Sequence, residues 1–132
     1  SWTNAMVQYM QQATGLNYLG FTSTANTRKQ AVGFLVHPRL EVLKGPIEYS
    51  QVASVQGVPD LRPAYRLDLR DRTTGAEFSA TVVHLKSMRG GPLATSAIRY
   101  KQLDILQKLL GPKYSGFVVG DLNWILTDKS LK

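Results

Sequence analysis

The chain has 132 residues, no cysteine and a net charge of +7, with 16 Lys and Arg against 9 Asp and Glu. Its hydrophobic fraction of 43% suits one globular domain over 1–132, and the lack of cysteine excludes disulfides and thiolate metal sites. The basic charge favours polyanionic partners such as nucleic acid, phospholipid head groups or phosphorylated substrates. No apolar stretch approaches the ~20 residues of a membrane span, and the sequence leaves the cellular compartment unknown.

The first part of the chain predicts a helix followed by strands. Thr3 or Asn4 can cap the helix and Gly15 can end it. The apolar face of this helix comprises Met6, Val7 and Met10. Apolar runs then predict strands at 31–38, 40–43 and 47–55, with a break at Pro38-Arg39. The run 40–43 either continues the strand before it or pairs with that strand in a hairpin.

The rest of the chain predicts a hairpin, a helix and a last strand. The segment 63–71 alternates, with Tyr65, Leu67 and Leu69 on one face and Arg66, Asp68 and Arg70 on the other. After a turn at Thr73-Thr74-Gly75, the segment 77–86 returns as the second arm. A loop over 88–96 leads to Ser96, which can cap a helix over 97–110 with Leu103, Leu106 and Leu110 on one face. Gly111-Pro112 ends that helix, and a strand follows at 117–120.

This order of elements predicts an α/β fold with a mixed sheet flanked by helices. The strands at 31–37 and 117–120 are apolar on both faces, so we expect sheets that are covered on both sides.

The stretch FVVGDLNW (117–124) places Asp121 and Asn123 just beyond a buried strand. Residues two apart in an extended segment project to the same side, and strand ends are where α/β proteins gather ligands. A carboxylate and an amide suit Mg²⁺ or Ca²⁺, or a water held beside a phosphate. Gly120 allows the backbone to turn or to approach a neighbour closely. The alternative is an ordinary Asx-type turn.

Other polar positions each have a functional and a structural interpretation. His84 ends an apolar strand in VVHLKS (82–87), on the face of Phe78, Ala80 and Val82, and is either a catalytic residue or a hydrogen-bonded core residue. Lys86 either binds substrate or lies at a solvated strand end. Arg62 in LRPAYRL is a candidate phosphate ligand, because arginine is the preferred fork for phosphate. Arg99 and Gln102 lie one helical turn apart and indicate the polar face of an amphipathic helix.

Taken in order, RPAY, VVHLKS, R-x-x-Q-x-x-x-L and VVGDLN resemble the endonuclease/exonuclease/phosphatase superfamily, with its deoxyribonuclease I-like fold. The similarity covers 77–124 in both spacing and element type, and extends more weakly over 31–76. It implies a four-layer α/β sandwich and a metal-dependent hydrolase of phosphoric esters.

The resemblance also implies roles for the matching residues. Asp121 would orient the attacking water, Asn123 would steady the water and the phosphate, and both would bind the metal, Mg²⁺ (or Mn²⁺ or Ca²⁺). His84 would contact the scissile phosphate. Arg62 would face substrate phosphates, with Lys86 beside it.

The chain departs from the family pattern at both ends. The strand that ends in the metal-binding Glu does not precede Ser1, and no Asp-His pair follows Trp124. We therefore expect an internal fragment of a family domain, without its N- and C-terminal strands and its main glutamate ligand. We expect this chain to be inactive alone, and to associate with a complementary chain that completes the fold.

The leading functional hypothesis is a nuclease-like, metal-dependent phosphodiester hydrolase whose partner is nucleic acid or another phosphate ester. One alternative is a lipid or small-molecule phosphomonoesterase of the same superfamily. The other is a non-catalytic basic remnant that binds nucleic acid.

Overall fold

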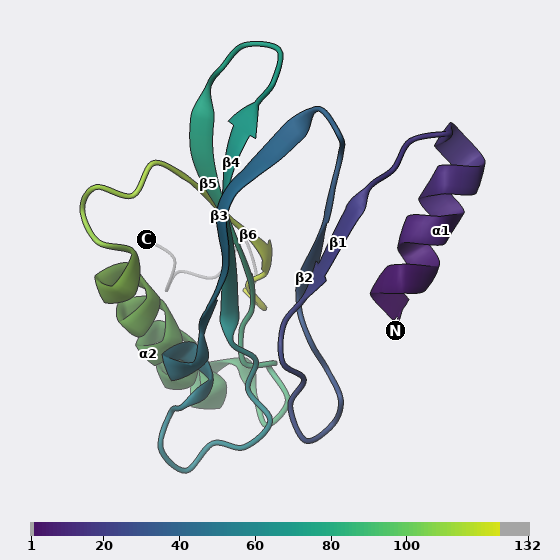
Figure 1. Ribbon diagram of the computed structural model, residues 1–132. Helices are drawn as coiled ribbons and strands as arrows, with labels where there is room; N and C mark the ends of the chain where they lie inside the picture. Colours follow the sequence, from purple (N-terminus) through teal and green to yellow (C-terminus); the bar gives the residue numbers. More distant parts are fainter. Residues whose placement is uncertain (1, 125–132) are drawn as a thin grey trace.

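The computed structural model describes residues 2–124, which form two sheets and two long helices stacked as layers (Figure 1). Helix α1 (Trp2–Thr14) lies outside a small antiparallel sheet of β1 (Leu19–Thr22) and β2 (Gly33–Val36). The larger sheet has the order β3 (Leu40–Tyr49), β4 (Ala64–Asp71), β5 (Glu77–His84) and β6 (Gly116–Asp121). Helix α2 (Pro92–Leu110) packs on its far face, and a short 3₁₀ helix, η1 (Ser50–Ala53), follows β3.

The larger sheet is mixed, as predicted. Strands β3, β4 and β5 are antiparallel neighbours, whereas β6 joins β5 in parallel. A helical crossover between β5 and β6 is what a parallel pair requires, and α2 supplies it. The fold is therefore the mixed α/β sandwich that the sequence predicted, and within residues 2–124 its larger sheet ends at β6.

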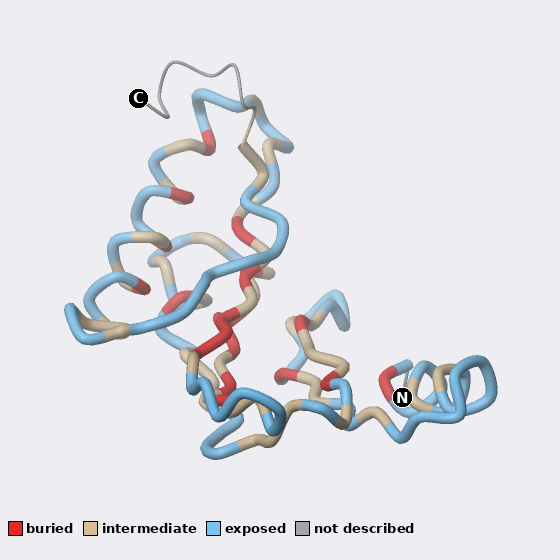
Figure 2. The backbone as a smooth tube through the Cα atoms, turned by 90° about the horizontal axis from the view of Figure 1, so that it is seen from above, coloured by how far each residue is buried: buried red, intermediate tan, exposed pale blue. Residues whose placement is uncertain are grey.

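The alternation along β4 divides the core into two clusters. Leu67 and Leu69 point toward the small sheet, where they pack with Val36 and Ala80. On the opposite face, residues of β4 and β5 pack with α2, in a cluster of Val52, Ala64, Val83, Leu85 and Leu106. Figure 2 shows the buried residues concentrated along these central strands, while α1 is largely exposed.

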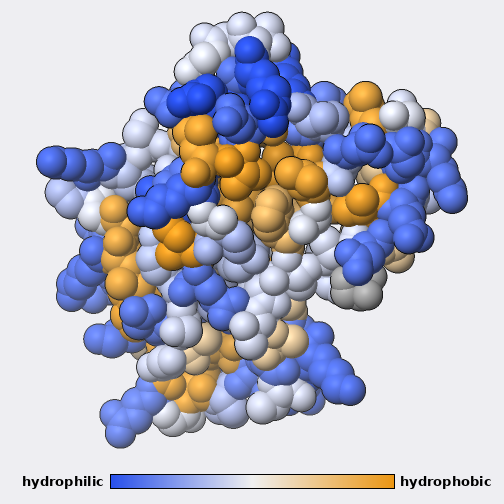
Figure 3. Space-filling view, in the orientation of Figure 1, coloured by the Kyte–Doolittle hydropathy of each residue, from blue (hydrophilic) through white to orange (hydrophobic). Residues whose placement is uncertain are grey.

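The prediction that both faces of the last strand are covered is wrong for β6. It is the edge strand of its sheet among the described residues, and all six of its residues are exposed. Phe117 still stacks on Phe78 of β5, but Phe117 and Val119 remain 48% and 44% exposed. Figure 3 shows apolar side chains at the surface, below the polar hairpin tip that joins β4 and β5. The apolar sequence of β6 is thus available for contacts beyond residues 2–124.

The N-terminal region differs from the prediction in two respects. Helix α1 begins at Trp2, so Thr3 lies inside it, and Thr3 and Val7, not Met6, face the close-packed Gly20 of β1. Gly15 ends the helix as predicted, and its amide donates to the Gln11 carbonyl. Strand β1 was not predicted, because LGFT is short and carries a glycine.

Three boundaries further along also differ. The segments predicted as strands 40–43 and 47–55 form one strand, β3, which pairs with β4 and not with β2, and residues 50–53 turn into η1. The register of β3 shifts around Gly45-Pro46, where proline cannot donate to the ladder. Helix α2 begins at Pro92, within the predicted loop, so Ser96 is not its cap. Pro92 suits the first turn because the amide it lacks has no helical partner there.

The predicted hairpin turn and the end of α2 are confirmed. Gly75 donates to the Asp71 carbonyl across the turn between β4 and β5. Gly111 follows the last residue of α2. Among residues 2–124, neither helix has the length and apolar character needed to cross a bilayer.

Candidate active site

The parallel pairing of β5 and β6 brings His84 and Asp121 together at one rim of the sheet. The two residues are register partners at the carboxyl ends of neighbouring strands. His84 Nε2 lies 3.3 Å from Asp121 Oδ2. The two apolar runs that each end in a polar residue, VVH and FVVGD, therefore end side by side. The catalytic roles of these residues remain predictions.

Gly120 permits this close approach. Its φ is +132°, and a Cβ at this position would lie 2.0 Å from the Val83 carbonyl oxygen on the adjacent strand. Any side chain here would push β6 away from β5. The glycine before Asp121 therefore sets the distance between the two strand ends.

Asn123 closes a turn that is fixed at both ends. Its backbone amide donates to Asp121 Oδ1 at 2.9 Å, which is the Asx-type turn left open as an alternative by the sequence. Its side-chain Nδ2 donates to the Leu85 carbonyl at 2.9 Å. The turn and the cluster therefore coexist, and the side-chain amide nitrogen of Asn123 holds the turn against the end of β5.

Arg62 approaches the same cluster from the loop before β4. Its Nη2 donates to Gln30 Oε1. Burial lowers the pKa of Arg62, and the charge of Asp121 opposes this. Burial, and then the charge of Arg62, lower the pKa of His84, against the opposing effect of Asp121. The His84 ring is therefore neutral at neutral pH, and Arg62 is close enough to act on both partners.

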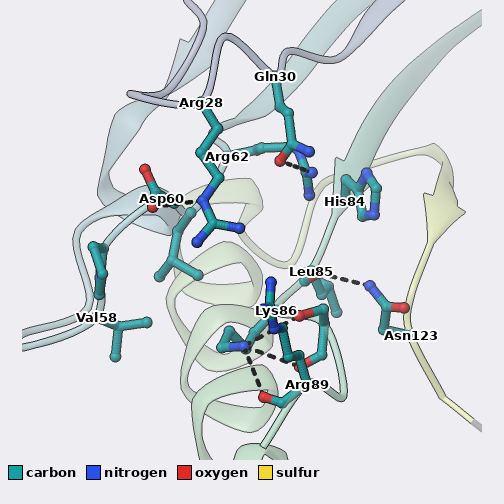
Figure 4. A pocket seen from close by; sticks show the side chains of 13 residues that line it. Arg28, Gln30, Val58, Asp60, Arg62, His84, Leu85, Lys86, Arg89 and Asn123 are labelled. Atoms are coloured by element: carbon teal, nitrogen blue, oxygen red, sulfur yellow. Dashed lines mark hydrogen bonds and ion pairs between the residues drawn. The ribbon is translucent and has the colours of Figure 1, made fainter.

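Arg62, His84 and Asn123 border a pocket of about 410 Å³ whose charged lining residues are mostly cationic (Figure 4). Such a volume lies within the roughly 300–1,000 Å³ typical of ligand pockets. The charged side chains in the lining are Arg28, Arg62, Lys86 and Arg89 against Asp60, with His84 and Asn123 also present. In Figure 4, Arg28 and Arg62 enter from one side while Lys86 and Arg89 lie on the other. The arrangement attracts a multiply charged anion.

Two of the four cations, Arg28 and Lys86, are held in different ways. Arg28 is paired with Asp60 at 3.1 Å, which orients its guanidinium over the pocket. The Lys86 ammonium donates to the Ser87 carbonyl, to Ser87 Oγ and to the Arg89 carbonyl, at 3.2 to 3.4 Å. Lys86 thus contributes charge while its donors bind its own loop. The sequence predicted Arg62 and Lys86 but not Arg28 or Arg89, because no local pattern marks those two.

The described residues do not provide a complete site for Mg²⁺. Within residues 2–124, no three His, Cys, Asp or Glu side chains gather where they could hold a metal ion. Asp121 is the one carboxylate in the cluster, and Oδ1 and Oδ2 already face Asn123 and His84. Mg²⁺ usually takes one or two carboxylates together with substrate phosphates. The described chain therefore offers part of such a ligand set, through Asp121 and the Asn123 side-chain oxygen.

Comparison with known proteins finds no matching family model and no matching curated protein. Solved structures do match. One is an endonuclease/exonuclease/phosphatase family protein from Bacteroides thetaiotaomicron, with a TM-score of 0.60 and 16% identity over 97% of this chain and 49% of that chain. Another is a mannosyl-6-phosphatase from the same species, with a TM-score of 0.58 and 16% identity over 97% of this chain and 51% of that one.

A third similar structure is D. rerio TDP2 complexed with a single-strand DNA product, with a TM-score of 0.64 and 22% identity over 92% of this chain and 44% of that chain. The chain thus has the fold of endonuclease/exonuclease/phosphatase proteins and spans about half the length of the solved relatives it matches.

Proposed function

We propose that the pocket binds a phosphoric ester, and that this chain contributes the His84–Asp121 side of a hydrolase site. The observation that carries the proposal is the contact of His84 with Asp121 at 3.3 Å, beside a pocket lined by Arg28, Arg62, Lys86 and Arg89. Hydrolysis of a phosphoric ester needs an oriented water and fixed donors for the charge that spreads over the phosphoryl oxygens. The cluster supplies groups for both needs.

The proposed roles follow from the side-chain atoms and charges that each residue can still offer to a ligand. Asp121 accepts a hydrogen bond from the attacking water and orients it toward phosphorus. Arg62 places a permanent charge, and His84 a neutral ring nitrogen, beside the phosphate. Asn123 uses its side-chain oxygen toward the water, since its amide nitrogen is already bound to the Leu85 carbonyl.

Mg²⁺ dependence is part of the proposal, with Asp121 and Asn123 as ligands within this chain. When bound, the ion would neutralise charge on the phosphate. Its remaining ligands, including the main carboxylate, would have to come from outside residues 2–124. The exposed edge and apolar faces of β6 favour a complementary chain or segment there, because an unpaired apolar strand edge tends to add another strand.

We propose a phosphodiester in nucleic acid as the substrate class. The excess of cations around the pocket supports it, and so does a similar structure that carries a single-strand DNA product. A phosphomonoester substrate is the alternative within the superfamily, since another similar structure is a mannosyl-6-phosphatase. A non-catalytic basic domain is a further alternative, favoured by the incomplete metal ligand set of the described residues.

The test is hydrolysis with a matched pair of variants in a complete parent domain. Asp121→Ala should lower turnover by at least ~10²-fold with nearly unchanged folding, because it removes the group that orients water in the transition state. Lys108→Gln, an exposed change on the outer side of α2, is the matched control and should have no effect. Normal turnover of Asp121→Ala would remove Asp121 from the mechanism.

The chain alone should not cleave a plasmid in the presence of Mg²⁺ or Mn²⁺. Plasmid cleavage that is sensitive to EDTA and abolished by Asp121→Ala would refute that expectation. Substrates separate the alternatives. Preference for a DNA strand over a sugar phosphate supports the nuclease, the reverse supports the phosphomonoesterase, and binding without turnover in the parent domain supports the remnant.

A further inference from the structure

Two polar side chains of α2 are buried where the sequence predicts a solvated helix face. Arg99 and Gln102 are 1% and 0% exposed, and they are among the largest fully buried side chains of the described chain. Neither lines the pocket. Burial of a guanidinium and an amide is costly unless their hydrogen bonds are made, so their partners indicate what they do.

Gln102 connects the chain just after β5 to η1, the short helix that follows β3. Its Oε1 accepts from the Lys86 backbone amide at 2.8 Å, and its Nε2 donates to the Val52 carbonyl at 3.1 Å. The Lys86 backbone lies directly after the β5 strand end that carries His84. Gln102 therefore fixes the point at which the chain leaves the sheet and enters the pocket wall.

Arg99 gathers the remainder of that loop. Its Nη1 donates to Thr95 Oγ1 at 2.7 Å and to the Lys86 and Ser87 carbonyls at 3.2 and 3.4 Å. Its Nη2 donates to the Pro92 carbonyl at 2.8 Å. One planar fork thus binds both ends of the loop from 86 to 92, which carries Arg89 to the pocket.

The same guanidinium also reaches the turn after β6. Arg99 Cζ lies 5.6 Å from the centre of the Trp124 ring, and that ring packs edge-on against Tyr100. Trp124 follows Asn123, whose side chain binds the Leu85 carbonyl. The two segments that border the pocket, 85–91 and 121–124, are therefore tied to each other and to one turn of α2.

We infer that Arg99 and Gln102 are positioning residues of the anion pocket, which hold these two segments in register without touching the bound anion. The inference rests on the proposed function for the pocket's role, and goes beyond it by assigning its geometry to α2. Arg99→Lys keeps the charge but loses the planar fork, so it separates geometry from electrostatic attraction.

The experiment compares Arg99→Lys and Gln102→Leu with Leu106→Ala, all in a Trp2→Phe background so that Trp124 is the one fluorescent tryptophan. Leu106 is 3% exposed, lies one turn further along α2 and packs in the apolar core cluster that includes Leu85, so its truncation destabilises the helix but removes no hydrogen bond to either segment. The measurements are the affinity for inorganic phosphate, the emission of Trp124 and hydrogen exchange of the Lys86 amide.

Arg99→Lys and Gln102→Leu should each weaken phosphate binding by about tenfold, as supporting residues of bound ions do. Arg99→Lys should shift Trp124 emission to the red, and Gln102→Leu should speed exchange of the Lys86 amide. Leu106→Ala should bind phosphate within about twofold of the affinity of the unsubstituted chain, measured at a temperature well below the melting temperature of the variant.

Equal weakening by Leu106→Ala would overturn the inference, since the effect would then be general stability. Unchanged Trp124 emission and Lys86 exchange in the variants would overturn it as well. Failure of the unsubstituted chain to bind phosphate would instead count against the proposed function, and the emission and exchange data would still decide whether α2 positions the two segments.

Discussion

Replacing Gly120 by alanine tests the geometry of the candidate site most directly. The new Cβ would lie 2.0 Å from the Val83 carbonyl oxygen, against 3.4 Å or more for ordinary contact. The strands must therefore part by more than 1 Å, at the position next to the His84–Asp121 pair. We expect a loss of stability together with a displaced Asp121.

The magnitude follows from two contributions. Alanine at φ +132° costs about 1–3 kcal/mol of backbone strain. Loss of one or two ladder hydrogen bonds between β5 and β6, such as the 3.0 Å bond from the Leu85 amide to the Asp121 carbonyl, adds about 0.5–1.5 kcal/mol each. The free energy of unfolding should fall by about 1.5–6 kcal/mol. A displacement of about 1 Å is also enough to lower turnover of a complete domain by ~10²-fold.

The assay is urea denaturation combined with the NMR shift of the His84 ring. Gly111→Ala is the matched control, because its φ is +79° but nothing lies within 4 Å of the new Cβ. It should cost only the strain, about 1–2 kcal/mol, and leave the His84 shift unchanged. A Gly120→Ala protein with the stability and His84 shift of the unsubstituted chain would refute the close approach of the two strands.

Three further outcomes can be measured on the same protein. Burial and the charge of Arg62 lower the pKa of His84, so below the ordinary value of about 6.5 the unfolded chain binds more protons than the folded chain. Stability should therefore fall as the pH drops below about 6.5 and level off above it. The NMR titration midpoint of His84 should lie below that of a His84 peptide and should rise in Arg62→Gln, whereas an unshifted midpoint would contradict the burial. Leu67→Ala, in the fully buried core between the sheets, should cost about 2–5 kcal/mol in denaturation, and a loss below 1 kcal/mol would argue that the two sheets do not pack as described. Arg62→Ala should weaken binding of a single-stranded oligonucleotide and flatten its salt dependence, and an unchanged slope would remove Arg62 from the phosphate contacts.

The strands with a clear period and the residues at their ends were predictable from the sequence. The alternation over 63–71 became β4 with the predicted faces, because a sheet with one face on each core cluster requires that period. Likewise FVVG followed by Asp121, and VVH at 82–84, became parallel neighbours whose last residues meet. Local pattern suffices there because it fixes where each strand ends.

The sequence was wrong where tertiary contacts override local pattern. It predicted a covered β6, yet β6 is the exposed edge of its sheet within residues 2–124. An apolar strand sequence indicates that the strand is usually covered, but it does not show which segment covers it. It missed β1, because LGFT is short and carries a glycine and only its pairing with β2 makes it a strand. It also assigned Arg99 and Gln102 to a solvated face, because helical spacing cannot distinguish polar side chains that meet water from those that bind loop carbonyls.

The pocket itself was decided by tertiary structure. The sequence by itself predicted which residues would contact phosphate or the attacking water, namely Asp121, Asn123, His84, Arg62 and Lys86, and these roles stay predictions. It could not show that Arg28 and Arg89 also line the pocket, or that the Lys86 ammonium donates its hydrogen bonds to carbonyls of its own loop. These side chains come from segments separated by tens of residues, and only tertiary packing brings the β1–β2 loop, the loop before β4 and the ends of β5 and β6 around one cavity.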